Sequence, residues 1–275
     1  MIRLAVRCEP AQAELVLAEL VQLSPAGVEE RSGPGWVEYA IYGAEGELPE
    51  LGELEAVAGE GRLSVRSERM PDDWAERWRE FHQPALVAGG RVVIRPSWRP
   101  RPDPWRGGLD VVIDPGQAFG TGAHPTTRMC VELMLDLADS GHARGALVDL
   151  GTGSGVLAIV AAKLGWEPVL GVDNADAALA AARENAGANG VYARFERGDL
   201  REGEPPGAPT ALANLTAPLL RELAGRLPAS VERLVCSGLL AGERDDVARA
   251  FGRAGLLVRD ERREGDWAAL LLERR

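Results

Sequence analysis

The stretch that decides the fold is residues 148–155, with the sequence VDLGTGSG. It leaves an apolar run that is typical of a buried strand, turns on three alternate glycines and enters an apolar segment with the pattern of a helix. Glycine is needed where the backbone takes a positive φ or where a ligand must approach without a Cβ in the way. Because open α/β sheets bind ligands at the carboxyl ends of their parallel strands, this turn predicts a ligand crevice at such an edge.

Strands and helices alternate from residue 146 to the end of the sequence. Such alternation predicts an α/β fold, here a Rossmann-like domain whose seven-stranded sheet is largely parallel and covered on both faces. The last two strands are joined by a short polar turn, so we expect them to pair antiparallel at one edge. The expected strands are 146–150, 169–173, 193–196, 210–215, 234–237, 256–260 and 267–272, and helices are expected to start near residues 156, 175, 218 and 243.

The sequence before this region divides into two further parts. Residues 1–70 read as a small N-terminal α+β (ferredoxin-like) domain in the order βαββαβ, with strands at 3–7, 28–31, 36–42 and 62–67 and helices at 11–22 and 48–57. Residues 71–108 read as a linker helix with aromatic residues at helical spacing, followed by a connector rich in proline, arginine and tryptophan. The larger domain is then expected to span residues 109–275.

Composition narrows the class of protein. The chain has 275 residues, of which 45% are hydrophobic and 27% are charged, as expected of a globular protein. No apolar run reaches the roughly 18 to 20 residues that cross a bilayer, and the first ten residues lack a signal-peptide core, so we expect a cytoplasmic protein without a membrane partner. The three cysteines are far apart in the sequence, which predicts buried free thiols and no metal site.

Net charge indicates the kind of partner. The chain carries a formal net charge of -11, which argues against direct binding of nucleic acid and allows attraction to a basic protein. Residues 1–70 hold much of this acidic excess. A merely solvated acidic surface explains the charge equally well.

Two carboxylates accompany the glycine turn. Asp149 stands two residues before Gly151, and Asp173 ends the next expected strand, where a carboxylate can accept hydrogen bonds from both hydroxyls of a ribose. A nicotinamide dinucleotide would need the pattern GxGxxG, but here the third glycine comes one place early and an acid that would repel phosphate precedes the loop. S-adenosylmethionine has no phosphate and carries a cationic amino group and a sulfonium, so it suits this loop better. A tight strand-to-helix turn without a ligand is the simpler alternative.

Two more polar residues follow the later strands. Asp199 follows the third strand, where it would accept a hydrogen bond from an adenine amino group; a solvated loop aspartate is the alternative. Asn214 ends the fourth strand and offers the crevice both an acceptor and donors. Its alternative role is to cap the helix that starts near residue 218.

Three segments together carry a family resemblance. Residues 114–127 (DPGQAFGTGAHPTT), the glycine turn and residues 214–219 (NLTAPL) resemble the PrmA family of class I S-adenosylmethionine-dependent methyltransferases. Residues 78–82 and 96–98 also fit that family. The resemblance covers residues 71–275 by motif, and residues 1–70 only by their expected topology. Enzymes of this family methylate the large-subunit ribosomal protein numbered eleven.

The resemblance implies a set of site residues. Phe119 and its neighbouring glycines would fold over the cofactor as a lid, the N-terminal domain would recognise the substrate, and Asn214 would be the catalytic residue. No metal is expected. The residues predicted to bind S-adenosylmethionine are Phe119, Gly120, Thr121, Thr126, Thr127, Asp149, Gly151, Gly153, Gly155, Asp173, Asp199 and Asn214.

The implied reaction is transfer of methyl groups to amino groups of a basic ribosomal protein, on lysine side chains and, as a second acceptor, the N-terminal α-amine, by a monomeric enzyme. We expect Asn214 to accept a hydrogen bond from the neutral amine and to align its lone pair. His124 as a general base is a second hypothesis, although a loop histidine before proline more often holds backbone in place. The alternatives are methylation of another protein or small-molecule amine, and a non-catalytic module that binds the donor. Nucleic-acid methylation is disfavoured because no aromatic residue follows Asn214 to stack a base.

Overall fold

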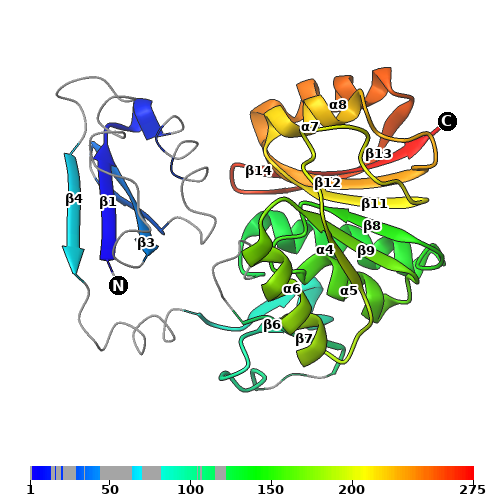
Figure 1. The fold of residues 1–275 in the computed structure, drawn as a ribbon, viewed down its shortest axis with the longest axis horizontal. Helices are drawn as coiled ribbons and strands as arrows, with labels where there is room; N and C mark the ends of the chain where they lie inside the picture. The colour runs from blue at the N-terminus through cyan, green and yellow to red at the C-terminus, as the bar shows by residue number, and fades with distance from the viewer. Residues whose placement is uncertain are drawn as a thin grey trace. The chain divides into compact units, whose positions relative to one another are not determined.

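The computed structural model describes residues 2–13, 16, 20, 29–33, 35–43, 64–69, 82–103, 105, 107–114 and 122–275. Its chain divides into two compact units, one built mainly from residues 1–81 and the other mainly from residues 82–275 (Figure 1). The two units are described separately below.

The N-terminal unit contains a four-stranded antiparallel sheet in the order β2-β3-β1-β4. All four strands predicted in this region are confirmed, with shifts of one or two residues at their ends. The helix predicted at 11–22 lies largely outside the described residues, and the predicted helix at 48–57 and most of the predicted linker helix lie wholly outside them. The strands are β1 (Ile2–Cys8), β2 (Glu29–Gly33), β3 (Trp36–Gly43) and β4 (Ser64–Arg69), and a 3-10 turn spans Pro10–Gln12.

Alternation along β1 sends apolar and charged side chains to opposite faces of this sheet. Leu4 and Val6 belong to the buried apolar cluster of the unit. Arg3 and Arg7 both bind the carboxylate of Glu38 on the neighbouring strand, at 2.9 and 2.8 Å. One face therefore forms the core and the other is held by paired charges.

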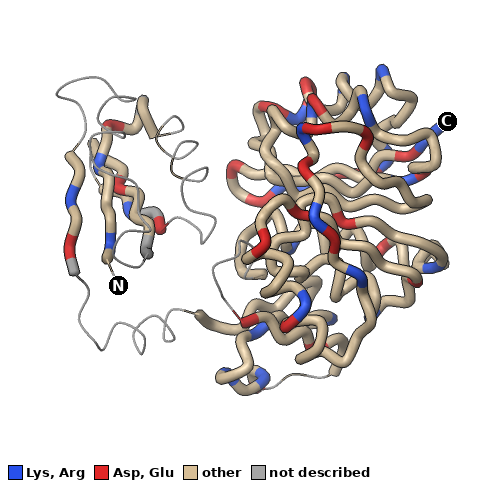
Figure 2. The backbone as a smooth tube through the Cα atoms, in the orientation of Figure 1, with Lys and Arg blue, Asp and Glu red and all other residues tan. Residues whose placement is uncertain are grey.

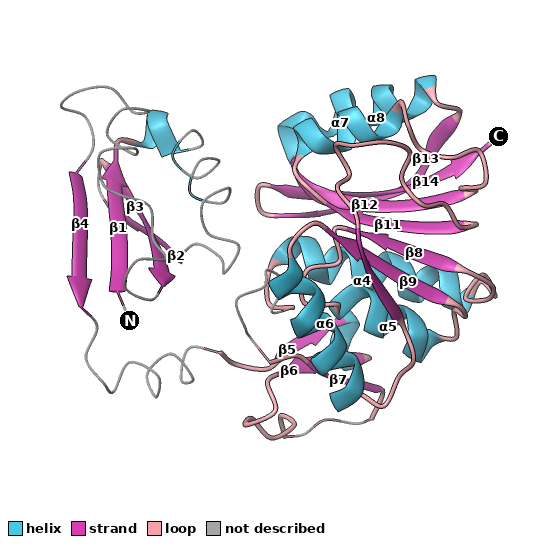
Figure 3. Ribbon diagram, in the orientation of Figure 1, coloured by secondary structure: helices cyan, strands magenta, loops and turns pink. Residues whose placement is uncertain are grey.

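The second unit is built on a seven-stranded sheet in the order β10-β9-β8-β11-β12-β14-β13 (Figure 3). The first five strands of this order pair in parallel, and β14 pairs antiparallel with β12 and β13. The largely parallel sheet with an antiparallel edge is therefore as predicted. The strands are β8 (Leu147–Leu150), β9 (Val169–Asp173), β10 (Arg194–Arg197), β11 (Thr210–Asn214), β12 (Arg233–Leu240), β13 (Leu256–Glu264) and β14 (Trp267–Arg274).

Helices cover both faces of this sheet, as Figure 1 shows, and each face has its own buried cluster. One face is covered by α4, α5 and α6, and the other by α7 and α8. Of these, α4 was not predicted from the sequence, and His124, predicted to lie in a loop, caps its first turn. The helices are α4 (Pro125–Asp139), α5 (Val156–Leu164), α6 (Asp176–Ala188), α7 (Ala217–Ala224) and α8 (Arg244–Arg253), with a 3-10 turn at Ala241–Glu243.

Residues 82–112 form a small three-stranded sheet of the second unit, where the sequence predicted a connector. Its strands are in the order β5-β6-β7, and Val92, Ile94 and Val111 join the same apolar cluster as α4 and α5. The structure therefore places the boundary between the units near residue 81, whereas the sequence placed the start of the large domain at residue 109. The strands are β5 (Ala85–Val87), β6 (Val92–Arg95) and β7 (Leu109–Val112), with a 3-10 turn at Ala88–Gly90.

Charged residues of both signs are interspersed along the described chain, as the tube in Figure 2 shows. The three cysteines are buried free thiols, as predicted. Within the described residues, no helix is both long and apolar enough to cross a bilayer.

Candidate functional site

The carboxyl ends of β8 and β11 meet where the chain order of the large sheet reverses. β8 pairs with β9 on one side and with β11 on the other. The strands β9 and β10 therefore lie on one side of β8, and the next strands in the chain, β11 and β12, lie on its other side. Such a switch point leaves a crevice between the loops that follow the two strands. The glycine turn at residues 151–155, called the glycine loop below, follows β8, and Asn214 ends β11. The fold therefore brings the two strongest sequence motifs together.

The glycine loop is a tight turn whose backbone conformation strongly favours glycine. Gly151, Gly153 and Gly155 have φ values of 76°, 53° and 80°, in the left-handed region that other residues rarely adopt. The amides of Gly151 and Thr152 donate to the Val172 carbonyl at 2.8 and 2.9 Å, which fixes the loop to β9. A Cβ at Gly151 would overlap the Leu215 side chain, so the loop packs directly against the residue after Asn214.

Asp149 lies beneath this loop and is almost completely buried, with 1% of its surface exposed. The Thr152 hydroxyl donates to its Oδ2 at 2.7 Å. Burial raises the pKa of Asp149 to about 7, with a further increase from the negative charge of Asp173, against hydrogen bonds from Thr152 and the Ala158 amide that lower it. This carboxyl group therefore sits close to its ionisation point at neutral pH, where a nearby cation would favour the charged form.

Asp173, at the end of β9, is oriented by backbone amides on both of its oxygens. Gly153 N donates to Oδ2 at 2.9 Å and Ala175 N donates to Oδ1 at 3.0 Å. Each carboxylate oxygen has a second lone pair. The carboxylate thus ties the glycine loop to β9 and keeps acceptor capacity for the two hydroxyls of a ribose.

Asn214 is joined to the first turn of α4. Its Nδ2 donates to Thr126 Oγ1 at 3.3 Å and to Thr127 Oγ1 at 3.5 Å. Both threonines are buried, with at most 1% exposure. Of the candidates from the sequence, Thr126, Thr127, Asn214 and the glycine loop are therefore brought into one constellation.

Asp149 and Asp173 bind the glycine loop, but the other four predicted site residues are not joined to it by the described contacts. Asp199 accepts from the amide of Arg201 at 2.8 Å, which closes a local turn in the loop after β10. Phe119, Gly120 and Thr121 lie outside the described residues. Their roles stay predictions.

Asn185 is a residue of this region that the sequence reasoning missed. It lies in α6 with 3% of its surface exposed; its Nδ2 donates to the Ser154 carbonyl of the glycine loop at 2.9 Å, and its Oδ1 accepts from Asp114 N at 3.1 Å. It thereby connects the glycine loop to the segment that leads toward residues 115–121. The available signal was an asparagine on the apolar face of an amphipathic helix, since a buried amide needs partners.

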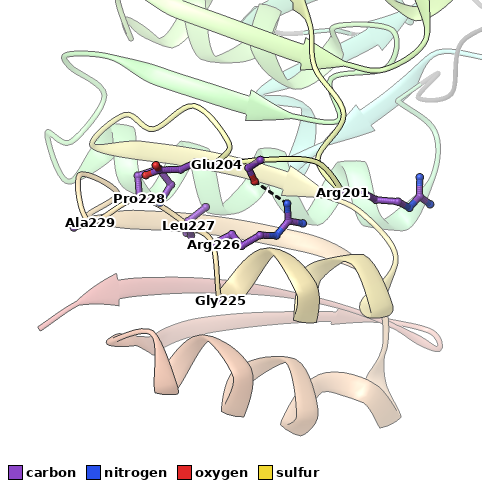
Figure 4. Close-up of a pocket in the computed structure, with 8 residues that line it drawn as sticks. Arg201, Glu204, Gly225, Arg226, Leu227, Pro228 and Ala229 are labelled. Atoms are coloured by element: carbon purple, nitrogen blue, oxygen red, sulfur yellow. Dashed lines mark hydrogen bonds between the residues drawn. The ribbon is translucent and has the colours of Figure 1, made fainter.

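A separate cavity of about 570 Å³ lies beside the loops that precede β11 and β12 (Figure 4). Arg226 donates to the carbonyls of Leu200 and Gly203 there, the latter at 2.9 Å, so its guanidinium fixes the loop around the cavity. The glycine loop and Asn214 follow their strands, so this cavity is distinct from the site. It is lined by Arg201, Gly203, Glu204, Gly225, Arg226, Leu227, Pro228 and Ala229.

The residues of the switch point suit S-adenosylmethionine better than a phosphorylated coenzyme. The loop turns on three glycines, and the carboxylates of Asp149 and Asp173 each bind it, through Thr152 and Gly153. Two carboxylates favour a cationic ligand and would repel a phosphate. Asp173 also has the capacity to bind ribose hydroxyls. Within the described residues there is no group of three or more His, Cys, Asp or Glu placed to hold a metal ion.

Comparison with known proteins agrees with this site. The sequence model of the family described as ribosomal protein L11 methyltransferase (PrmA) matches residues 41–275. The chain belongs to this family. The PrmA family assignment makes the protein an S-adenosylmethionine-dependent methyltransferase.

Individual relatives carry the same description. A ribosomal protein L11 methyltransferase from Geobacter metallireducens is 40% identical over 74% of this chain and 66% of its own length. One from Symbiobacterium thermophilum is 32% identical over 98% of both chains. The crystal structure of a ribosomal protein L11 methylase from Lactobacillus delbrueckii subsp. bulgaricus is 28% identical and matches with a TM-score of 0.59, covering 70% of this chain and 99% of that one. The fold is thus that of a PrmA methyltransferase.

Proposed function

We propose that this protein transfers methyl groups from S-adenosylmethionine to amino groups of ribosomal protein L11, on lysine side chains and, as a second acceptor, the N-terminal α-amine. One observation carries the proposal: the Asn214 amide lies at the switch point beside the glycine loop, held by two buried threonine hydroxyls. The names of the relatives support ribosomal protein L11 as the substrate.

In this proposal the residues around the glycine loop hold the donor. Asp173 accepts from the ribose hydroxyls, Asp149 supplies negative charge beneath the loop, and the left-handed turn at Gly151, Gly153 and Gly155 brings the backbone of the loop to the donor. Thr127 and the predicted residues 119–121 complete the site. The bound donor supplies an electrophilic methyl group on a positively charged sulfur.

The acceptor amine must be neutral before it reacts. A lysine with a pKa of about 10.4 is neutral in only about one molecule in 2,500 at pH 7. Removal from water and a nearby positive charge both favour the neutral amine. The leaving group is uncharged, so no acid is needed, and orientation of the reactants is the main contribution, for which about 7 to 11 kcal/mol is available in well-aligned systems.

Asn214 performs this orientation. Its NH2 group is bound to Thr126 and Thr127, which leaves its Oδ1 to accept an N–H bond from the amine. An amine held in this way directs its lone pair toward the methyl group. An amide takes up no proton, so the proton that the amine loses must pass to water.

Mass spectrometry of ribosomal protein L11 after incubation with enzyme and donor tests the reaction. The wild type should add methyl groups, in steps of 14 mass units, to lysine-containing peptides. Asn214→Ala should lose most of the turnover, and Arg201→Ala, at the separate cavity, should keep it. Full turnover by Asn214→Ala with unchanged donor affinity would show that the amide has no role.

We also propose that residues 1–70 form a ferredoxin-like domain that recognises the substrate. The strand order β2-β3-β1-β4 supports this topology. The described part of the N-terminal unit contains five arginines and five glutamates, so the acidic excess of residues 1–70 is carried by segments that the structure does not describe. Attraction of a basic substrate would therefore depend on those segments.

Deletion of residues 1–70 tests the recognition role. The shortened chain should bind S-adenosylhomocysteine as the full chain does, which shows that the second unit is folded, and it should no longer methylate ribosomal protein L11. Methylation at the full rate would contradict substrate recognition by this domain.

We place the reaction in the cytoplasm, where ribosomal proteins are made. We also propose that the enzyme works as a monomer, and light scattering of the purified protein tests this oligomeric state.

A further inference from the structure

His124 is fixed at the start of α4 by contacts on two sides. Its Nδ1 lies 2.7 Å from Thr126 Oγ1 and 3.4 Å from the Thr126 backbone nitrogen. Its ring packs edge-on against Trp267 of β14, with ring centroids 4.9 Å apart and planes at 72°. The imidazole is therefore held in one orientation by α4 and β14 together.

These contacts determine which way the hydrogen bonds run. The Thr126 backbone N–H can only donate, so the Nδ1 that it approaches must be an acceptor without a proton. The Thr126 hydroxyl then donates its proton to the same nitrogen. Its oxygen keeps lone pairs for Asn214 Nδ2, which lies 3.3 Å away. A continuous chain thus runs from the Asn214 amide, through the Thr126 hydroxyl, to His124.

We propose that His124 is a positioning residue, which fixes the Asn214 amide through Thr126 so that its oxygen faces the acceptor amine. The inference rests on the proposed function, in which Asn214 aligns the amine. An amide anchored by its NH2 group presents Oδ1, which binds an amine N–H and leaves the amine's lone pair free. An amide turned over would present N–H groups, which bind that lone pair and remove it from the reaction.

The surroundings of His124 keep it in the form that this role needs. Burial lowers its pKa from the usual 6.5, the nearby Arg128 of α4 lowers it further, and Glu264 of β13 acts in the opposite direction. Arg128 and Glu264 are themselves paired, with Nε and Oε2 3.3 Å apart. The ring is therefore neutral at pH 7, with Nδ1 available as an acceptor.

A second role must be separated from this one, because His124 is also the N-cap of α4. Loss of a cap destabilises a helix whatever the residue at position 126. Positioning through Thr126 instead requires the Thr126 hydroxyl. A double-mutant cycle with His124→Ala and Thr126→Val separates the two roles, since valine keeps the size and the backbone N–H of threonine but removes the hydroxyl.

The cycle is measured as kcat for methylation of ribosomal protein L11 by the full chain, with donor affinity from calorimetry. His124→Ala should lower kcat about tenfold, the loss expected from one hydrogen bond, at unchanged donor affinity. In the Thr126→Val background the same change should lower kcat less than twofold. His124→Asn, whose side-chain oxygen can replace Nδ1 as acceptor, should recover most of kcat. Equal losses from His124→Ala in both backgrounds would show a structural cap only and would overturn the inference.

A readout without substrate separates this inference from the proposed function. The side-chain amide signals of Asn214 in ¹⁵N NMR spectra are identified by their absence from Asn214→Ala. They should shift in His124→Ala and return in His124→Asn. Unchanged signals would refute the positioning role even in an active enzyme. A wild type that methylates no ribosomal protein L11 would refute the proposed substrate, and the NMR result would still decide the role of His124.

Discussion

Replacing Asp149 with asparagine should make the free protein more stable at alkaline pH while weakening donor binding. The carboxyl group is buried beneath the glycine loop, and its partners are the Thr152 hydroxyl and the Ala158 amide. Asparagine has the same shape. Its oxygen can accept from Ala158 and its NH2 group can donate to the Thr152 hydroxyl, so the substitution removes the charge and keeps both contacts.

The size of the effect follows from the shift in the ionisation of Asp149. Folding raises its pKa from 3.8 to about 7, mainly through burial. Each pKa unit corresponds to about 1.4 kcal/mol, so ionisation at pH 8 lowers the free energy of unfolding by about 4 kcal/mol. Between these pKa values the folded state keeps a proton that the unfolded state has released. The stability that comes from protonated Asp149 is therefore fully present below about pH 4 and is lost as the pH rises through 7.

Urea unfolding of the free protein at pH 5 and pH 8 measures this effect. At pH 5 about 2 of the 4 kcal/mol are already lost, so the advantage of Asp149→Asn over the wild type should grow by about 2 to 3 kcal/mol between the two pH values. The exposed Asp103 provides the control, and Asp103→Asn should show no such growth. A difference between Asp149→Asn and wild type that is the same at both pH values would refute a buried, unfavourable charge at Asp149.

Donor binding should respond in the opposite direction. A cationic ligand favours the ionised carboxylate, so calorimetry at pH 8 should show weaker binding of S-adenosylmethionine to Asp149→Asn than to wild type. Equal affinity would mean that the charge beneath the loop does not act on the donor.

Two further substitutions test how the site is held. Gly151→Ala should lower the free energy of unfolding by about 1 to 3 kcal/mol and should also lower donor affinity, because its Cβ would overlap Leu215. The control is Gly190→Ala, with a similar φ of 63° but open space around it, which should lower stability less and leave donor affinity unchanged. Equal effects of the two substitutions in unfolding and binding assays would contradict the packing argument. Asn185→Ala should lower the free energy of unfolding by about 1 to 3 kcal/mol and weaken donor binding, because the Ser154 carbonyl loses its partner. The control is Asn189→Ala, which releases Val112 but does not contact the glycine loop, and it should lower stability alone. Calorimetry of both variants checks this, and tight donor binding by Asn185→Ala would remove Asn185 from the site.

Much of the fold of the second unit could be predicted from the sequence, because it depends on local chemistry. The glycine turn, the acids at 149 and 173 and the alternation after residue 146 predicted a parallel sheet with its crevice, because glycine backbone freedom and strand periodicity depend on neighbours in the chain. The strand limits at 169–173 were predicted without error. The family resemblance rested on the same motifs, and the comparisons confirm it.

The three-stranded sheet of residues 82–112 and the helix α4 were not predicted, because short apolar runs are ambiguous until a partner surface is known. Val92 and Ile94 are strand residues in the structure because they pack against the cluster shared by α4 and α5. The sequence, which has no information on that packing, read them as part of a connector.

The sequence by itself determined which groups are available at the site: glycine at three alternate positions, two acids and one amide. Only the tertiary structure decided how they are joined. It set Asn214 against Thr126 and Thr127, 87 to 88 residues earlier in the chain, linked Thr126 onward to His124, and placed Asn185 between the glycine loop and Asp114. Hydrogen bonds of this kind depend on distance and direction in space, and the packing of α4 and α6 on the sheet sets both.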